Sequence, residues 1–320
     1  MATLDSPSRE IFTTEPDEAV IAGPGWDIRA YRLRRGSFGF LRRARQIAPG
    51  LSLEESHLRS GGLRIEGALR ARRLQIGFFE SEEFRLLGSP FYSGVMCVAY
   101  SGSFWETVAN LPGSGLTVNF AESMLERVVP LRTAPLLLAR LNGPLGASSA
   151  LLPLNAAGLA LERKARALMN EEAPEGLEER AAAAQELIDL GVALVDTLLC
   201  EPESTIGPPA RHELAVAVER MLWKSPQADG YPLTSLEDAA ARLGVSRRTI
   251  QLALQEHFGI GFVALKRAIR LQQARAALRS LPRKQVLDIA HAHGFHHFGR
   301  FARYYREMFG HLPSAETAGP

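Results

Sequence analysis

The sequence predicts an α+β chain with a β-barrel at the N-terminus, a helical region after it and an all-α C-terminal domain. Three observations predict this class. Short apolar runs bounded by Gly, Pro or Ser fill residues 26–120, as expected for strands joined by turns. After Ala121 the apolar residues recur with helical spacing. The last third of the chain contains an internal repeat of about fifty residues.

The length of 320 residues is enough for two domains, each with its own core. We expect boundaries where the composition of the chain changes. The expected segments are a flexible lead-in over 1–20, a β-rich domain over 21–150, a helical linker region over 151–210, an all-α domain over 211–313 and a tail over 314–320.

Charge is distributed unevenly along the chain, although the net charge is only +2. Residues 211–313 hold 16 Lys and Arg against 8 Asp and Glu, a net charge of +8, whereas residues 1–210 have a net charge of −5. A basic module behind a mildly acidic one indicates that the C-terminal part contacts a polyanion. A solvated basic face would give the same numbers, so charge alone leaves both readings open.

Cysteine content and the first residues set the expected compartment. Cys97 and Cys200 are far apart in sequence and form neither a disulfide framework nor a CxxC metal motif. Met1–Pro7 lacks the basic and apolar regions of a signal peptide. The apolar run Leu190–Leu199 is too short to cross a bilayer and contains Asp196. We therefore expect a cytoplasmic protein without a membrane segment.

Within the β-rich domain, Leu63–Leu69 alternates apolar and polar residues, the pattern of a half-buried strand. The other clear candidates are bounded by turn residues in the same way: Trp26–Leu33, Leu74–Phe79, Gly94–Tyr100 and Leu116–Phe120. Many short strands without long helices between them favour an antiparallel barrel or sandwich. The region that follows predicts three helices: Glu122–Val129, Ala156–Asn170 and Glu175–Leu199.

Two groups of apolar side chains before residue 210 are candidate binding residues. The candidates for a small-molecule cavity are strand aromatics: Trp26, Phe78, Phe91 and Trp105. Aromatic residues in strands are also ordinary core residues, so that alternative stays open. In the last of the three helices Leu187, Leu190 and Leu194 form an apolar stripe. This stripe predicts that the helix pairs with its copy in a homodimer.

The internal repeat defines two copies of one supersecondary unit. Leu236, Ala240 and Gly244 recur fifty positions later as Val286, Ala290 and Gly294. Farther along, Ile250, Phe258 and Gly259 recur fifty-one positions later as Phe301, Phe309 and Gly310. The second copy therefore has one extra residue in its turn. A helix with a small residue, a Gly that permits a positive φ and a second helix are the parts of a helix-turn-helix.

In the first copy, Thr234 or Ser235 can cap the first helix and Ser246 the second, which runs from Arg247 to His257. Three apolar residues at intervals of four point inward: Ile250, Leu254 and Phe258. Four polar residues are left on the outer face as candidate contacts: Arg247, Arg248, Gln251 and Gln255. Arg and Gln can each form two hydrogen bonds to a guanine or an adenine edge in the major groove of DNA.

In the second copy, Phe301, Tyr305 and Phe309 form the buried stripe. The candidate contacts outside this stripe are His297, Arg300 and Arg303. A long helix over Phe262–Arg279, ended by Pro282, joins the copies. Its expected inward residues are Leu265, Ile269 and Leu278, and its expected exposed residues are Lys266, Arg267 and Arg270.

The sequence indicates neither a metal site nor a catalytic site. His291, His293, His296 and His297 lie across a turn, and no Cys or carboxylate completes a ligand set. No paired carboxylates, Ser/His/Asp pattern or phosphate-binding Gly-rich loop stands at a telling spacing. We therefore expect no cofactor, no metal and no enzymatic activity.

At these residues the chain resembles a known family. The pattern Gly294-Phe295-x5-Phe301-x-Arg303-x-Tyr305-x3-Phe309-Gly310-x2-Pro313 resembles the signature of the AraC/XylS transcription regulators. The segments Ser235–Ala240 and Gly244–Thr249 match their first helix-turn-helix. The resemblance covers residues 211–313. Around Gly294–Phe301 and Pro313-Ser314 the chain is most similar to members that resemble the ethanolamine-utilisation regulator.

Two positions depart from the family pattern. Leu252 stands where many members have a polar or basic residue on the first recognition helix, which puts base reading by that helix in doubt. Gly261-Phe262 replaces the usual Ser-Pro before the long helix, and we expect this change to relax the start of that helix.

The resemblance implies a cupin-like sensory domain that binds a small-molecule effector or a partner and shifts how the C-terminal domain is presented to DNA. It further implies a transcriptional activator that contacts RNA polymerase. Two alternatives remain from the residues. One is an enzyme fused to a DNA-binding domain, such as an Ada-type repair methyltransferase, which needs a reactive cysteine cluster. The other is a regulator whose N-terminal domain binds protein only.

Overall fold

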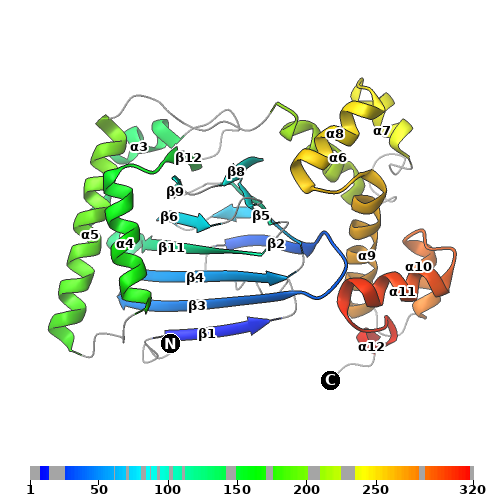
Figure 1. Ribbon diagram of the computed structural model, residues 1–320, viewed down its shortest axis with the longest axis horizontal. Coiled ribbons are helices and arrows are strands. Elements are labelled where there is room, and N and C mark those ends of the chain that lie inside the picture. The colour runs from blue at the N-terminus through cyan, green and yellow to red at the C-terminus, as the bar shows by residue number, and fades with distance from the viewer. Residues whose placement is uncertain are drawn as a thin grey trace. The chain divides into compact units, whose positions relative to one another are not determined.

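The computed structural model divides the chain into two compact units, and its elements are labelled in Figure 1. It describes residues 8–13, 26–60, 62–69, 72–80, 84–86, 88–91, 94–100, 104–109, 112–141, 149–170, 176–200, 210–224, 235–280 and 285–317. The first unit consists of Met1–Ala30, Gly39–Arg59 and Ile65–Pro208, and the second of Tyr31–Phe38, Ser60–Arg64 and Pro209–Pro320. The main boundary, at Pro208, falls in the Pro-rich segment where the composition changes.

The first unit contains two antiparallel sheets. The larger has seven strands in the order β1 (Ser8–Thr13), β3 (Gly39–Ala48), β4 (Leu51–Ser60), β11 (Gly113–Ala121), β6 (Arg73–Glu80), β9 (Val95–Tyr100) and β12 (Ser149–Pro153). The smaller has the order β2 (Trp26–Arg32), β5 (Leu63–Leu69), β10 (Phe104–Ala109), β7 (Phe84–Leu86) and β8 (Ser89–Phe91). The β-rich N-terminal domain is confirmed. Its described strands form two sheets, however, and not the closed barrel that we expected.

Four helices follow or interrupt the last strands of this unit: α2 (Glu122–Val128), α3 (Ala134–Leu141), α4 (Ala156–Asn170) and α5 (Leu177–Cys200). Figure 1 shows α4 and α5 crossing the strands at one end of the seven-stranded sheet. The main core lies between these helices and the sheet, and it includes the fully buried Leu53, Ile76 and Leu187. Gly191 permits this close packing, because a Cβ there would lie 2.9 Å from the Phe120 ring.

The alternation of side chains in β4 shows where the core ends. Leu51 and Leu53 point into the helix-covered core and are fully buried. Glu55, His57 and Arg59 follow at intervals of two and therefore share that face of the strand. They are only partly buried or exposed. One end of the seven-stranded sheet is thus apolar beneath the helices, and the other end presents charged side chains.

Several expectations for the first unit need correction. The lead-in over residues 1–20 contains a strand, β1, which pairs with β3 from Ser8 opposite Arg45 to Thr13 opposite Phe40. The sequence analysis also missed β3 and β4, because their charged residues break the apolar alternation. These charges pair across the strands, with Arg42 next to Glu54 and Arg43 next to Glu55. Such cross-strand pairs stabilise a sheet without apolar side chains.

The second unit is helical from residue 210 onward. Its helices are α6 (His212–Trp223), α7 (Leu236–Leu243), α8 (Arg247–Phe258), α9 (Phe262–Ser280), α10 (Val286–Ala292), α11 (Phe298–Phe309) and α12 (Ser314–Thr317). The pairs α7–α8 and α10–α11 are the two expected helix-turn-helix units, and α9 joins them. None of the described helices in either unit has the length and apolar character needed to span a bilayer.

The described part of the predicted tail, residues 314–317, is helical. Ser314–Thr317 forms α12, and Glu316 on this helix is bound by three side chains. The Glu316 carboxylate accepts hydrogen bonds from Arg275 at 2.6 Å, Arg279 at 2.8 Å and Tyr305 at 2.9 Å. The side chain of Glu316 is only 7% exposed. This carboxylate fastens the end of the chain to α9 and α11.

Two short segments from the first third of the chain belong to the helical unit. Arg64 donates two hydrogen bonds to Glu219 of α6, from Nη2 at 2.8 Å and from Nε at 3.1 Å. Both side chains are at least 99% buried. Tyr31 donates a further hydrogen bond to Glu219 and packs against the Trp223 ring at 5.2 Å. Residues 31–38 and 60–64 therefore complete the core of this unit around α6.

Candidate nucleic-acid interface

The first helix-turn-helix is formed by local interactions that the sequence specifies. The Ser235 hydroxyl accepts a hydrogen bond from the Asp238 amide at 3.1 Å, and this caps α7. Gly244 ends α7 with a φ of 65°, which only Gly adopts without strain. The Ser246 hydroxyl caps α8 by accepting from the Thr249 amide at 3.1 Å. These three residues set the angle at which α8 leaves the turn.

The inward stripe of α8 is confirmed, because Ile250, Leu254 and Phe258 are fully buried. Their burial places the candidate contacts on the opposite side of the helix. Arg248 and Gln255 are exposed. Within the described part of the chain, neither Arg248 nor Gln255 bonds to another side chain, so both are available to a ligand.

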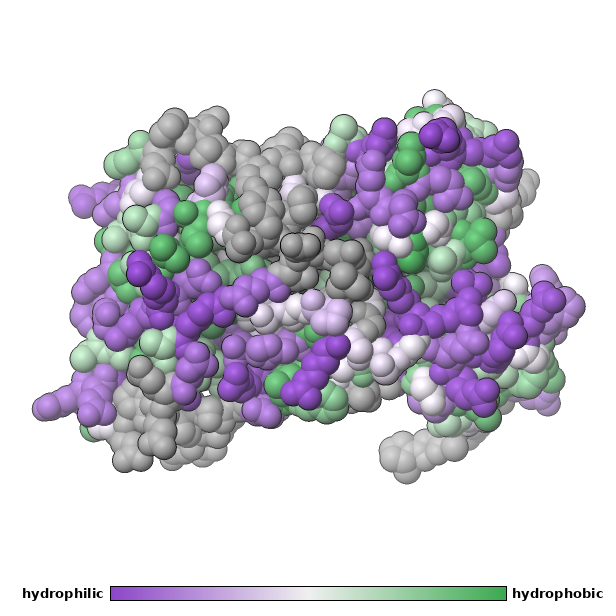
Figure 2. Space-filling model, viewed as in Figure 1, coloured by the Kyte–Doolittle hydropathy of each residue, from purple (hydrophilic) through white to green (hydrophobic). Residues whose placement is uncertain are grey.

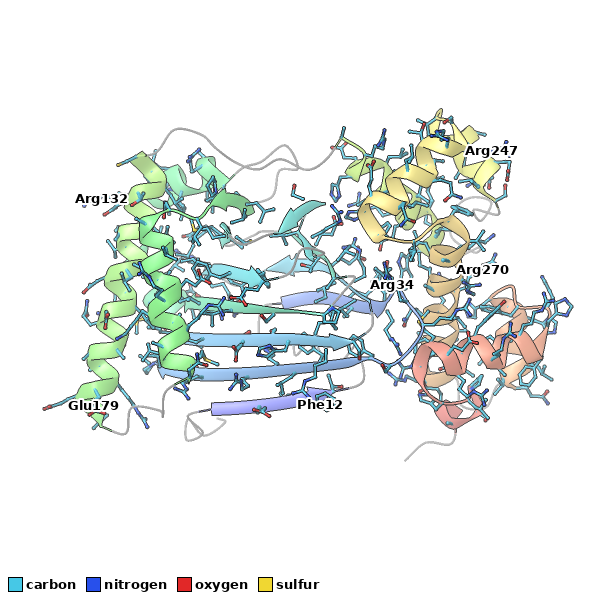
Figure 3. All side chains as sticks on the ribbon, in the orientation of Figure 1. Phe12, Arg34, Arg132, Glu179, Arg247 and Arg270 are labelled. Atoms are coloured by element: carbon cyan, nitrogen blue, oxygen red, sulfur yellow. The ribbon has the colours of Figure 1, made fainter. Side chains whose placement is uncertain are left out.

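Arg247 is exposed but has an internal partner. Its guanidinium lies 2.8 Å from the carboxylate of Glu237 on α7, and both side chains are more than 60% exposed. The hydrogen bond from Arg247 lowers the pKa of Glu237, so the pair is charged at neutral pH. Figure 3 shows Arg247 at the end of the α7–α8 unit. A phosphate would have to compete with Glu237 for this side chain.

Gln251 has a structural role that the sequence analysis missed. Its Oε1 accepts a hydrogen bond from the Phe262 amide at 3.5 Å, at the N-terminus of α9. Gly261, which has no side chain to cap this helix, lies directly beside it, and a Cβ there would be 2.9 Å from the same oxygen. Gln251 thus supplies from α8 the cap that Gly261 cannot supply. The signal for this role was the replacement of Ser by Gly at position 261.

The second helix-turn-helix reproduces the first, with the extra residue where the repeat placed it. Gly294 follows α10 with a φ of 76°, and three residues separate it from the start of α11 at Phe298. Two residues separate Gly244 from the start of α8 at Arg247. The inward stripe of α11 is confirmed: Phe301 and Tyr305 are fully buried and Phe309 is 6% exposed.

The outer side of α11 carries the remaining candidates. His297, Arg300 and Arg303 are all exposed. Arg303 lies 3.8 Å from Glu307 and 5.2 Å from the centre of the Tyr304 ring. Arg300 contacts no acidic side chain among the residues that the structure describes. Figure 2 shows hydrophilic side chains over much of the visible surface of this helix-turn-helix.

The joining helix α9 connects the two helix-turn-helix units. It contributes an apolar face and basic side chains. Leu265, Ile269 and Leu278 are fully buried, as expected. Lys266 and Arg270 are only partly exposed, which corrects the expectation of an exposed basic face. Burial lowers the pKa of Arg270, whose guanidinium lies against Gly294, 2.9 Å from where a Cβ would be. Arg270, labelled in Figure 3, thus supports the turn of the second unit.

Comparisons with known proteins agree with this geometry. A family model described as a helix-turn-helix domain matches residues 239–318, which contain both units. The C-terminal part of the chain is a helix-turn-helix domain of the AraC type. Over 87 residues the chain is 39% identical to a probable thc operon regulatory protein of Rhodococcus erythropolis. Over 78 residues it is 37% identical to the HTH-type transcriptional regulator GlxA of Rhizobium meliloti.

These matches are confined to part of each protein. The chain spans about a quarter of the length of these relatives, 26% and 24%, and they match 27% and 24% of the chain.

Among solved structures, the AraC-like transcriptional activator CuxR is 15% identical, with a TM-score of 0.44 and coverage of 84% of this chain and 96% of that one. A probable AraC family regulator from Rhodopseudomonas palustris is 31% identical, with a TM-score of 0.29 and coverage of 33% and 95%.

Of the four candidate cavity residues of the first unit, Phe78 is the one whose side chain the structure describes. Phe78 is 1% exposed and packs in the core cluster that includes residues of α4 and α5. It alternates with Gln75 and Gly77 along β6, which places it on the helix side of the sheet. The side chains of Trp26, Phe91 and Trp105 lie outside the described residues.

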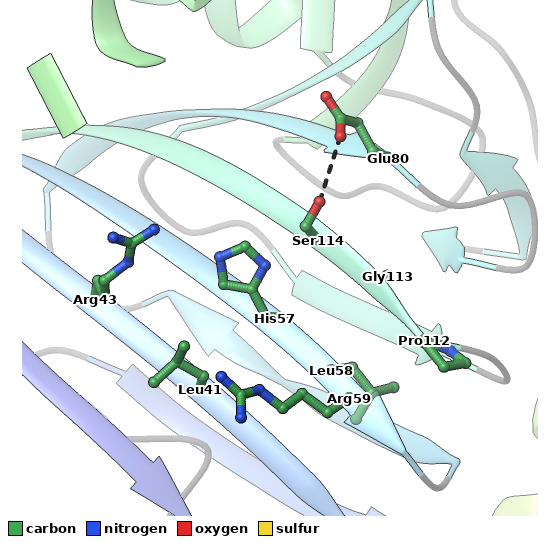
Figure 4. Close-up of a pocket in the computed structure, with 9 residues that line it drawn as sticks. All are labelled: Leu41, Arg43, His57, Leu58, Arg59, Glu80, Pro112, Gly113 and Ser114. Carbon is green, nitrogen blue, oxygen red and sulfur yellow. Dashed lines mark hydrogen bonds between the residues drawn. The ribbon is translucent and has the colours of Figure 1, made fainter. Parts of the chain in front are cut away.

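A hollow of about 650 Å³ lies instead over the polar end of the seven-stranded sheet. Its lining comes from β3, β4, β6 and β11 and is drawn in Figure 4. Arg43, His57 and Arg59 supply basic groups, whereas Glu80 supplies a carboxylate that Ser114 contacts at 3.5 Å. Arg43 is paired with Glu55. The hollow is therefore lined by groups of both charges, of which the Glu80 carboxylate also lies 2.9 Å from the Arg166 guanidinium.

The predicted dimer stripe also needs correction. Leu187 and Leu194 are fully buried within a single chain, where they pack against the seven-stranded sheet. Leu190 is partly buried against the same core. Leu187 and Leu194 belong to the core of the first unit and are not available to a second copy.

Proposed function

We propose that this protein is a sequence-specific DNA-binding regulator of transcription. The observation that carries the proposal is the duplicated helix-turn-helix, in which both second helices present basic side chains outward. Arg248 on α8 and Arg300 on α11 are exposed and have no acidic partner in the described chain. The net charge of +8 over residues 211–313 supplies the attraction to phosphate.

Salt dependence of duplex binding tests this proposal. We expect affinity for duplex DNA to fall steeply as salt rises, because each neutralised phosphate releases counterions. The full chain is the right material, since residues 31–38 and 60–64 complete the helical unit. The measurement is fluorescence anisotropy with a labelled duplex across a salt series. Absence of binding at low salt, or a flat salt response, contradicts the proposal.

We further propose that the regulator is an activator that contacts RNA polymerase, as the family resemblance implies. In vitro transcription from a selected binding site distinguishes the outcomes. An activator raises the amount of transcript, a repressor lowers it, and a protein that only binds DNA leaves it unchanged.

Control by a small molecule is the third part of the proposal. The hollow over β3, β4, β6 and β11 is the site that supports it, and its mixed charges favour a zwitterionic effector. Native mass spectrometry of the protein purified from its own host would detect a bound molecule by its mass. Loss of that mass in Arg59→Ala would assign the molecule to the hollow, whereas retention would place it elsewhere. A protein-only partner remains the second candidate, and it predicts no bound small molecule.

The burial of Leu187 and Leu194 removes the interface on which the predicted homodimer rested. Sizing with light scattering at micromolar concentration measures the oligomeric state. The rival reading, an Ada-type methyltransferase, requires a reactive thiolate. Burial raises the pKa of Cys97 far above its ordinary value, which keeps this thiol protonated and unreactive.

A further inference from the structure

Each of the two second helices exposes one large apolar side chain. Leu252 on α8 is 38% exposed, and Phe298 at the start of α11 is 44% exposed. Leu252 lies within the outer stripe of α8, flanked at helical spacing by Arg248 and Gln255. An isolated apolar residue on a surface needs no explanation, but these two lie on the faces that carry the candidate DNA contacts.

The internal repeat relates the two apolar residues in a specific way. Positions fifty-one residues apart are equivalent in α8 and α11, as Ile250 and Phe301 demonstrate by their burial. By this rule Arg247 is equivalent to Phe298, and Leu252 is equivalent to Arg303. The first helix therefore has its basic residue at the first turn and its apolar residue at the second. The second helix has the reverse order at these two positions, and it carries a further basic residue, Arg300, in its first turn.

The surroundings of Phe298 favour contact with a ligand. Its ring packs on one side against the Phe301 ring, with 6.3 Å between ring centres, which fixes its position. Gly299 follows it, and a Cβ there would have nothing within 4 Å, so the space beside the ring is open. His297 and Arg300 flank it on the exposed surface. The arrangement is an anchored apolar group with basic neighbours.

In the major groove, the apolar group that a protein can read is the 5-methyl group of thymine. We propose that Leu252 and Phe298 each contact a thymine methyl group, and that the opposite order of apolar and basic residues reverses the order of the bases read by the two helices. This inference rests on the proposed DNA-binding function. It assigns sequence discrimination to side chains that form no hydrogen bond with a base.

The test replaces thymine by deoxyuridine, which removes the methyl group and leaves base pairing intact. The probe is a duplex selected by the full chain from a random pool, with each thymine replaced in turn. We expect one position in each contact block at which the replacement weakens binding about fourfold, the equivalent of one buried CH₂ group. In Phe298→Ala the penalty should vanish in one block, and in Leu252→Ala in the other, as in a double-mutant cycle.

The matched control is Val263→Ala, because Val263 is 70% exposed on α9 and lies outside both second helices. It should retain both penalties. A selected site without thymine in either block overturns the proposal, as do penalties below about 1.5-fold or penalties that persist in both alanine variants. Failure to select any duplex would contradict the proposed function itself, so the two failures are distinguishable.

Discussion

Single side chains in the second unit have separable roles, and Gln251 and Arg248 illustrate this. Both were predicted to read bases from α8. Gln251 also caps α9 through its Oε1, whereas Arg248 makes no contact with another described side chain. Loss of a helix cap costs stability, and loss of a base contact costs discrimination. Substitution of Gln251 should therefore lower stability, whereas substitution of Arg248 should lower discrimination between bases.

We expect Gln251→Ala to lower the free energy of unfolding by about 1 kcal/mol, the usual cost of a lost cap. Arg248→Ala should leave stability unchanged within about 0.5 kcal/mol and relax base discrimination by about 1–3 kcal/mol. Chemical denaturation and competition binding with base-substituted duplexes measure the two quantities. Equal loss of affinity for all duplexes in Arg248→Ala would mean that Arg248 contacts phosphate only.

The carboxylate of Glu316 gives the helical unit a specific acid sensitivity. Burial alone would raise its pKa, but hydrogen bonds from Arg279, Arg275 and Tyr305 outweigh burial and lower the pKa to about 2 from an ordinary value of 4.5. A carboxyl group whose pKa is lower in the folded state stabilises the fold above its unfolded pKa. That stabilisation is lost as the pH falls from about 4.5 towards 2.

We therefore expect Glu316→Gln to be less stable than the wild type at pH 7, with a difference that shrinks as the pH falls through this window. Thermal unfolding at pH 7, 5, 4 and 3 measures the difference in melting temperature. Glu256→Gln is a suitable control, because Glu256 is 45% exposed and pairs with the exposed Arg211. A difference independent of pH would exclude ionisation of Glu316 as the cause.

Among elements, α6 depends most on residues that are distant in sequence. The bidentate pair between Arg64 and Glu219 is buried, and Tyr31 adds a third hydrogen bond to the same carboxylate. Burial, followed by the charge of Glu219, raises the pKa of Tyr31, so its hydroxyl stays protonated and donates. A carboxylate removed from such a site leaves a buried guanidinium without its counter-charge.

We expect Glu219→Gln to destabilise the fold by about 3–5 kcal/mol, the cost of breaking a buried pair from one side. Replacing both partners, as in Arg64→Met with Glu219→Leu, should recover most of that loss, because no charge is left unpaired. Urea denaturation of the two variants measures this. If the double variant is as unstable as the single one, packing and not charge dominates the site.

Local patterns predicted the helical elements better than the sheets. Ser246, Gly244 and the buried stripe of α8 act within a few residues of one another, so their spacing in the sequence is enough to place them. β3 and β4 were missed because their stability comes from cross-strand pairs such as Arg42 with Glu54. The contact between Arg64 and Glu219 spans 155 residues, and no local signal in the sequence predicts it.

In the candidate site, too, local patterns could be predicted and contacts between distant residues could not. Its basic side chains could be located from the repeat alone, because helical periodicity decides which side of α8 and α11 faces outward. The burial of Phe78 beneath α4 and α5 could not be predicted, because strand alternation does not reveal which face of the sheet the helices cover. Whether Gln251 is free to bind a base also depended on its contact with Phe262, eleven residues away on the next helix.

At the scale of the whole molecule, the two second helices are joined by one continuous helix and not by a flexible linker. α9 has 19 residues and spans about 28 Å at ~1.5 Å per residue. One turn of B-DNA advances ~34 Å, so α8 and α11 can enter successive major grooves from one side of the duplex. The buried residues of α9, which include Leu265 and Ile269, hold this spacing fixed.

We therefore expect each chain to protect an asymmetric site with two contact blocks about ten base pairs apart on one face of the duplex. No palindrome is needed within the site, because the two reading helices differ in sequence. Hydroxyl-radical footprinting on a selected duplex gives the positions of both blocks. Arg248→Ala should weaken protection in one block and Arg300→Ala in the other. Contact blocks on opposite faces of the duplex, or a single block, would show that α9 does not set the spacing of the blocks. A palindromic site would show that two chains, and not the two helices of one chain, define the binding site.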